Sequence, residues 1–168
     1  NGGAGEIGHI KVVEDGPVCG CGQRGCLEAL ASGTAMARTM VERLSQGEES
    51  LVRELAAGDL CRVNMVIIGQ AAQAGDPLAN EVISDAMRYL GTTLANLVSI
   101  FNPELIIIGG GVTNIGPLLF QPISREIQRK AFPTFADNLS IVPAALGSRA
   151  GVLGAAAVAR QYLLDRQE

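Results

Sequence analysis

The chain has 168 residues, 48% of them hydrophobic, and a formal net charge of −4, which suits one globular domain with a substantial core. No apolar run reaches the roughly 18 residues of a membrane span and no charged-then-apolar leader opens the chain, so we expect a cytoplasmic protein with no membrane partner. The mild acidity, the lack of a lysine and arginine cluster and an aromatic content of 4% argue against nucleic-acid contacts by these residues.

The first third of the chain predicts a short strand, a loop and two helices. Residues 9–13 are apolar and β-prone, and the DGP sequence at residues 15–17 signals a turn. Helical composition follows over residues 27–31. The SGT sequence at residues 32–34 then offers a break and a new N-cap before a helix over residues 35–44.

The middle third predicts three helices. The first two cover residues 51–57 and 63–74, and Cys61, in this apolar context, is expected to be a buried small hydrophobe rather than a ligand. Asp76 and the proline after it form a cap before residues 78–100, where apolar residues recur at steps of three and four. This longest segment is the predicted central buried helix.

The last third alternates strands and helices. Residues 104–108 form an unbroken apolar run of strand length, as expected when both faces of the strand are covered. A helix over residues 117–130, a strand over residues 139–142 and a small-residue helix over residues 150–164 follow. Such alternation implies parallel pairing through right-handed crossovers, and therefore an α/β layered domain.

Three of the four cysteines and the only histidine lie close together near the start of the chain. They are His9, Cys19, Cys21 and Cys26, in the spacing H-x9-C-x-C-x4-C. One imidazole and three thiolates match the number and softness of ligands in a closed tetrahedral zinc site. Disulfides are the alternative, but three cysteines leave one unpaired, and a chain of this length needs no such staple. The spacing favours zinc.

The motifs around these residues resemble those of the ROK family of bacterial sugar kinases and sugar-responsive repressors. The resemblance rests on GEIGH at residues 5–9 and CGCGQRGCLE at residues 19–28. It extends through ASGTA at residues 31–35, the segment from 102 to 112, and the glycine- and alanine-rich segment from 146 to 156. It therefore covers nearly the whole chain and is closest to the C-terminal half of a bacterial glucokinase.

The resemblance implies an actin-like, ribonuclease-H-like ATPase fold, with residues 1–168 forming the larger C-terminal lobe and the N-terminal lobe absent from this chain. It also implies that the parent protein transfers a phosphoryl group from ATP, with magnesium, to a hexose, with glucose as the expected sugar. A homodimer or homotetramer is expected. A chain that opens at Asn1 without a methionine is in keeping with a piece of a longer protein.

The family positions that match this loop bind both metal and sugar. The resemblance implies that His9 holds a structural zinc ion with one ring nitrogen and a sugar hydroxyl with the other, while the three cysteines of residues 9–26 complete the metal site. Glu6 and Glu28 match positions that accept hydrogen bonds from sugar hydroxyls. From the residues alone, Glu6 equally suits a solvated loop, and Glu28 suits a first-turn acid favoured by the helix dipole.

A second family match concerns the nucleotide. The positions that match Gly109, Gly110, Gly111 and Val112 pack against the adenosine part of ATP, although a glycine turn between strand and helix needs no ligand. Their intactness favours a kinase over a repressor. The glycines at 147, 151 and 154 are expected to be close-packing positions in and before the last helix.

Two motifs of the family lie outside this sequence. They are the aspartate that acts as general base and an early Asp-Gly-Thr phosphate loop, so we expect the isolated chain to fold and bind zinc but not to phosphorylate sugar. An alternative function is the effector-binding and oligomerisation half of a ROK repressor. A zinc-stabilised binding module with no sugar role is a third. The preferred hexose, and ATP against polyphosphate as donor, stay open.

Overall fold

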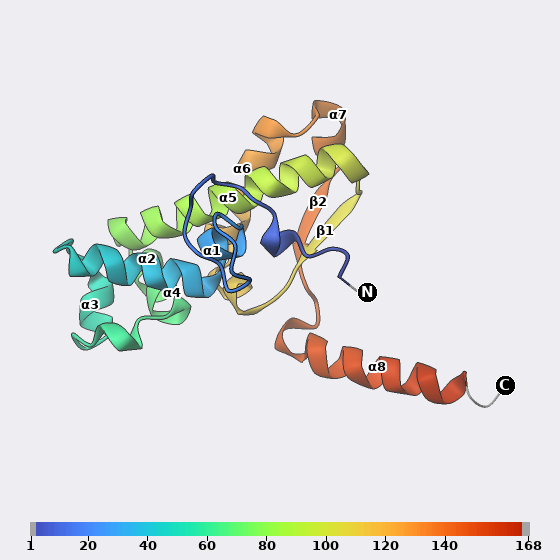
Figure 1. Cartoon of the computed structure of the whole chain (residues 1–168). Helices are drawn as coiled ribbons and strands as arrows, with labels where there is room; N and C mark the ends of the chain where they lie inside the picture. Colours follow the sequence, from blue (N-terminus) through green and yellow to red (C-terminus); the bar gives the residue numbers. More distant parts are fainter. Residues whose placement is uncertain (1–2, 166–168) are drawn as a thin grey trace.

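The computed structural model describes residues 3–165, so Asn1, at which the chain opens, lies outside the described residues. The architecture is mixed α/β and mostly helical (Figure 1). In chain order, with η for a 3-10 helix, the elements are η1 (Ile7–His9), α1 (Glu28–Ala31), α2 (Gly33–Ser45), α3 (Leu51–Leu55), η2 (Leu60–Arg62), α4 (Met65–Gln73), α5 (Pro77–Phe101), β1 (Leu105–Ile108), η3 (Gly111–Ile115), α6 (Pro117–Lys130), α7 (Pro133–Ala136), β2 (Ser140–Pro143), η4 (Gly147–Arg149) and α8 (Ala150–Leu164).

Helix α5 is the centre of the helical body, as its apolar pattern predicts. Side chains at steps of three and four along it are buried, and α6 lies along its length while α1, α2 and α4 also contact it (Figure 1). The buried α5 side chains of that pattern are Val82, Ile83, Ala86, Leu94 and Val98, with Leu90 and Leu97 partly buried beside them. Among the described residues no helix, α5 included, is both long enough and apolar enough to cross a membrane.

Polar side chains fix where four of these helices begin. Ser32, Ser50 and Asn64 each accept a hydrogen bond from a backbone amide in the first turn of α2, α3 and α4 respectively, which satisfies donors that a helix N-terminus leaves unpaired. Asp76 caps α5 through the Ala79 amide at 2.7 Å. The Asp76 carboxylate also accepts from the Ser50 hydroxyl at 2.9 Å, so one buried carboxylate joins the starts of α3 and α5.

The two strands pair in parallel, in the register Leu105 with Ser140 through Ile108 with Pro143. Parallel pairing confirms the α/β prediction, and the crossover between the strands contains α6. Alternate β1 side chains pack against the core, but Leu105 is 49% and Ile107 61% exposed. The prediction that both faces are covered is therefore wrong for the described residues. An apolar run shows that a strand can be buried on both sides, and only the packing of other elements decides whether it is.

The last helix, α8, matches the predicted residues 150–164 but extends away from the rest of the protein (Figure 1). None of its residues is buried. The prediction of close-packing glycines is wrong for the part of the chain that the structure describes, in which a Cβ added at Gly147, Gly151 or Gly154 would have no neighbour within 4 Å. Gly147 instead adopts a positive φ of 51°, a backbone conformation that turns the chain before α8.

Two further predictions are corrected at the level of local structure. Residues 9–13 form no strand, since η1 includes His9 and, within residues 3–165, the only ladder contact of this segment is an isolated antiparallel bridge from Lys11 to Cys26. Cys61 is exposed rather than buried, because the segment between α3 and α4 is a 3-10 turn that begins at a cap by Asp59. The break between the two predicted helices was expected here, but the apolar residues around Cys61 did not indicate that its side chain is exposed.

Candidate functional site

Residues 9–26, here called the cysteine loop, are held together by backbone hydrogen bonds between their two arms. The Val12 amide donates to the Gly25 carbonyl at 2.8 Å, and the Cys19 amide donates to the Gln23 carbonyl at 2.7 Å. Gly25 has a φ of 72°, and a Cβ there would lie 1.7 Å from the Val13 carbonyl oxygen. Only glycine at position 25 therefore lets the two arms come this close. Their approach brings together candidate ligands that lie far apart in the sequence of the loop.

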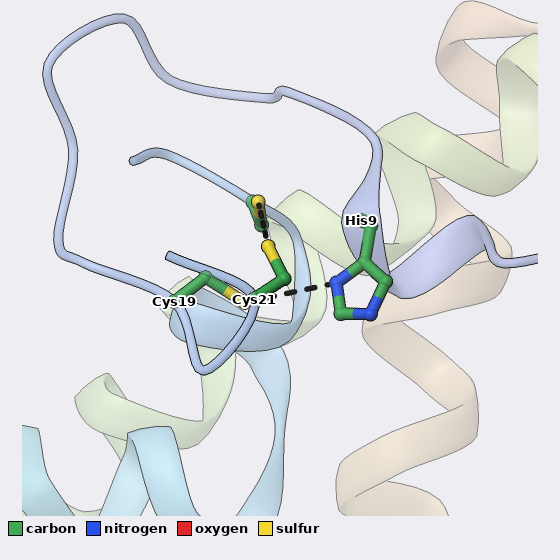
Figure 2. A group of neighbouring side chains, drawn as sticks. His9, Cys19 and Cys21 are labelled. Carbon is green, nitrogen blue, oxygen red and sulfur yellow. Dashed lines mark hydrogen bonds between the residues drawn. The ribbon is translucent and has the colours of Figure 1, made fainter. Parts of the chain in front are cut away.

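The structure gathers all four predicted metal ligands at one point. One ligand atom from each of His9, Cys19, Cys21 and Cys26 lies within 4.8 Å of the other three. Figure 2 shows how His9, Cys19 and Cys21 approach one another. The Cys21 and Cys26 sulfurs are 3.7 Å apart, as are the Cys19 sulfur and His9 Nδ1. Sulfurs about 2.3 Å from a tetrahedral zinc ion would be about 3.8 Å apart. The donor set and its spacing therefore fit a tetrahedral metal ion, and all four cysteines of the chain are free thiols rather than disulfides.

Burial makes the thiols of this cluster unequal. Cys26 is fully buried, and this burial raises the pKa of its thiol to about 11. Cys21 is exposed, and a hydrogen bond from the Gln23 backbone amide is the main cause that lowers the pKa of its thiol. A metal ion binds the thiolate form, so binding here must release protons, with the buried thiol the more costly one to ionise.

His9 and Glu28 lie at the edge of the cluster. In Figure 2 one imidazole nitrogen of His9 faces the cysteines while the other is directed away from them. The Glu28 carboxylate oxygen Oε1 is 3.8 Å from the Cys19 sulfur, and a Cβ added at Gly8 would lie 3.5 Å from the Glu28 Cβ. Both polar side chains are exposed, so a ligand could reach the free ring nitrogen and the carboxylate from solvent.

Secondary structure explains why these two groups meet. Glu28 is the first residue of α1, whose Ala29 side chain is buried with Cys19 and Cys26 in a small cluster separate from the main core. His9 ends η1, and its amide donates to the carbonyl of Glu6 at 3.1 Å. The Glu6 side chain is exposed and accepts no hydrogen bond from the described residues. The structure thus brings Glu28 to the cluster and ties Glu6 to it only through the backbone.

A pocket of about 650 Å³ lies between the start of α2, α4 and η3. Mainly apolar groups line it, and none of the lining side chains carries a charge. The lining residues are Gly33, Thr34, Ala37, Val63, Asn64, Met65, Val66, Gly69, Gln70, Gln73, Gly111, Val112, Asn114 and Ile115. A pocket of this size and character suits an uncharged organic group.

Only part of the predicted nucleotide segment lines this pocket. Gly111 and Val112 do, whereas Gly109 and Gly110 belong to the connection from β1 and are not among its lining residues. Helix α4 forms one wall of the pocket with residues that include Met65, Gln70 and Gln73, and this wall was not predicted as part of a site. Its sequence reads as an ordinary apolar helix, and no signal in the chain itself indicates that one of its faces borders a cavity.

The family model for the ROK family matches residues 1–162. The chain is 37% identical to a glucokinase from Thermotoga maritima over 158 residues, which are 94% of this chain and 50% of that protein. It is also 37% identical to the DNA-binding transcriptional dual regulator NagC from Escherichia coli over 165 residues, or 98% of this chain and 39% of the regulator. The chain thus spans about half the length or less of these relatives.

The fold agrees with these matches. A crystal structure of a ROK family glucokinase from Streptomyces griseus in complex with glucose and AMPPNP superposes with a TM-score of 0.84 at 38% identity. The match covers 94% of this chain and 52% of that one. Relatives named as a glucokinase and as a transcriptional regulator thus both match this chain, and its described residues adopt part of an actin-like ATPase fold. The chain belongs to the ROK family.

Proposed function

We propose that this chain is the C-terminal lobe of a sugar kinase that transfers the γ-phosphoryl group of ATP to a hexose, with glucose as the preferred substrate. The observation that carries the proposal is the joint placement of the four-ligand cluster and Glu28, with one nitrogen of His9 directed away from the cysteines. A relative with 38% identity was crystallised with glucose and an ATP analogue, which supports the same pair of ligands here.

In this proposal His9, Cys19, Cys21 and Cys26 hold a structural zinc ion. Bound zinc would fix the tautomer and the plane of the His9 ring, because a metal on one nitrogen leaves the other with a defined role. The free nitrogen then contacts a sugar hydroxyl. Glu28 and Glu6 accept hydrogen bonds from further hydroxyls, and a carboxylate suits this task because it accepts two donors with charge-assisted strength.

The nucleotide would use the pocket beside η3. Its neutral, mainly apolar lining suits the adenosine part of ATP, with Gly111 and Val112 on one side, while the preceding residues Gly109 and Gly110 lie nearer β1. The charged phosphates and their magnesium ion would lie outside the pocket. Catalysis in such an enzyme rests on aligning the sugar hydroxyl with the phosphoryl group and excluding water.

The remaining parts of the reaction belong to the rest of the parent protein. The general base and the phosphate loop expected from the family are not in these 168 residues. We therefore expect the isolated chain to bind metal without turning over any sugar, whereas the full-length parent is active.

The test is an assay of the full-length parent protein for ATP-dependent formation of glucose 6-phosphate, run in parallel with glucose binding and metal analysis. Glu28→Gln should weaken glucose binding by roughly 1.5 to 3 kcal/mol, the worth of a hydrogen bond to a charged group, with metal content unchanged. Glu14→Gln is the control, since Glu14 is also an exposed glutamate but lies in the cysteine loop outside the ligand cluster. Loss of metal in the Glu28 variant, or no phosphorylation of any hexose, would contradict the proposal.

A second candidate is the effector-binding half of a ROK repressor, favoured by the match to NagC over 98% of this chain. Such a protein would bind a sugar through the same residues and phosphorylate none. The residues that precede this chain in the parent decide between the two, since a helix-turn-helix indicates a regulator and an Asp-Gly-Thr strand a kinase. A zinc-stabilised module with no sugar role would show no thermal stabilisation by any hexose.

A further inference from the structure

The pocket beside η3 has an unusual set of polar side chains for a site that accepts a nucleotide base. Three of its five polar residues carry amides that make no side-chain hydrogen bond within the described part of the chain: Gln70 and Gln73 on α4, and Asn114 on η3. All three are exposed. They are therefore free to rotate, and no neighbour dictates which end of each amide faces the pocket.

The other two polar side chains are already engaged. The Asn64 oxygen accepts from the Val66 and Ile67 amides at 2.9 and 3.2 Å, and its nitrogen donates to the Arg62 carbonyl at 3.0 Å, so this amide is used in capping α4. The Thr34 hydroxyl pairs with the Ser32 hydroxyl at 2.9 Å. Neither offers a fixed, unused group for the edge of a base.

Whether the polar groups of a site are held in place or can rotate decides how strongly the site discriminates between similar ligands. A site that holds a buried polar group in place rejects a ligand without the matching partner by about 10⁴- to 10⁵-fold, whereas an apolar pocket discriminates by only about 10²-fold. Adenine and guanine differ in the order of donors and acceptors along one edge. A primary amide carries both a donor and an acceptor, and a free one can turn to match either base.

We propose that this site reads the base of the phosphoryl donor only through the movable amides of Gln70, Gln73 and Asn114, so that the parent kinase accepts guanine as well as adenine nucleoside triphosphates. The inference rests on the proposed function, because it assigns the pocket to the donor base. To that function it adds which nucleoside triphosphates serve as phosphoryl donors, and which residues select the base of the donor. None of the described residues that line the pocket has a charged side chain that could act as the selector.

The experiment measures kcat/KM of the full-length parent for ATP and for GTP at saturating glucose. We expect the two values to lie within about 100-fold of each other, the limit for a site without a fixed polar selector. A preference for ATP beyond about 100-fold, with glucose still phosphorylated, would overturn the inference and leave the proposed function standing. No phosphorylation with either nucleotide would overturn both.

Acidic variants identify the selecting residues. In Gln70→Glu, Gln73→Glu and Asn114→Asp the side chain loses its donor, so it can pair with the adjacent donors on guanine but repels the acceptor of adenine. At least one of the three should shift the ratio of the two kcat/KM values toward GTP by about tenfold or more, within the range of a single polar contact. Gln121→Glu, on an exposed position of α6 outside the pocket, is the matched control. Unchanged ratios in all three variants would contradict the assignment.

Discussion

The cysteine loop and the helical core around α5 are ordered by different means. In the core, large apolar side chains such as Met87 and Ile123 are fully buried, and burial of this kind stabilises a fold without any ligand. In the cysteine loop the buried side chains are two cysteines, which join Ala29 in a small cluster separate from the main core. The core is a scaffold in its own right, whereas we expect the loop to depend on a metal ion held by its four candidate ligands.

This separation has a functional consequence. Glu28 begins α1, which packs against both α2 and α5, while His9 lies on the far arm of the loop. The two groups proposed to bind sugar therefore come from the two differently stabilised regions. The relative position of His9 and Glu28 depends on whether the cysteine loop is folded, so we expect metal affinity and sugar affinity to change together. The apolar packing of the core is expected not to change with either.

The largest expected effect is on the loop. Structural zinc sites contribute on the order of 10 kcal/mol, and Cys21→Ser removes one of the four ligands. We expect this variant to lose bound zinc, hydrogen-exchange protection of residues 9–26 and sugar affinity together, with the amides of α5 still protected. Metal analysis and hydrogen exchange of the zinc-loaded protein make the measurement.

Cys61→Ser provides the control for this variant, because Cys61 is also an exposed thiol but lies in η2. It should retain zinc and sugar binding. Sugar binding by a metal-free Cys21→Ser protein would show that the loop orders His9 without metal, and the comparison between the two regions would then fail.

The second effect is on the core. Met87→Ala removes a fully buried side chain from α5 and should lower the free energy of unfolding by about 2 to 5 kcal/mol, without changing zinc affinity. Ile100→Ala on the same helix truncates a side chain that is 69% exposed and should change stability by no more than about 0.5 kcal/mol. Urea unfolding followed by circular dichroism measures both, and equal effects would mean that the exposed end of α5 is buried in solution.

The third effect tests the contact between α5 and α6. A Cβ at Gly91 would lie 2.6 Å from the Glu126 Cβ, so Gly91→Ala should destabilise by about 1 to 3 kcal/mol through overpacking, despite the roughly 1 kcal/mol that alanine gains over glycine in a helix. Gly154→Ala in α8 meets nothing within 4 Å and should show only the gain. Thermal unfolding of the two variants should therefore shift in opposite directions, and a stabilised Gly91→Ala protein would contradict the packing.

Local signals in the sequence predicted most of this fold. The cap at Asp76 and the apolar spacing after it predicted α5 to within a residue or two, and the cysteine spacing predicted a cluster that the structure assembles. The short α7 was missed. The failures lie where the answer depends on packing between distant segments. The exposed face of β1, the exposed α8 and the α4 wall of the pocket each have the composition of buried elements, and composition does not say what packs against them.

The smallest effect concerns charge at the same contact between α5 and α6. The Glu126 carboxylate accepts from Lys130 at 2.8 Å and from Arg129 at 3.0 Å, and these cations, Lys130 first, lower the pKa of Glu126. Lys130 also donates to the Thr92 hydroxyl of α5 at 2.6 Å. Glu126→Gln keeps the Cβ that faces Gly91 and removes only the charge, so it separates electrostatics from packing.

A lowered pKa in the folded state means that ionised Glu126 stabilises the fold at pH values above the usual glutamate pKa of about 4.3, and that this contribution disappears as the pH falls through the lower folded-state pKa. At pH 7 we expect Glu126→Gln to cost about 0.3 to 0.5 kcal/mol, typical of a helical i,i+4 pair, and the cost to vanish in acid. Glu14→Gln, at an exposed acid outside the helices and without an ion pair in the described residues, should cost nothing at either pH. Since the substitution leaves the packing atoms in place, a cost that persisted in acid would have to come from the hydrogen bonds between the two helices rather than from charge.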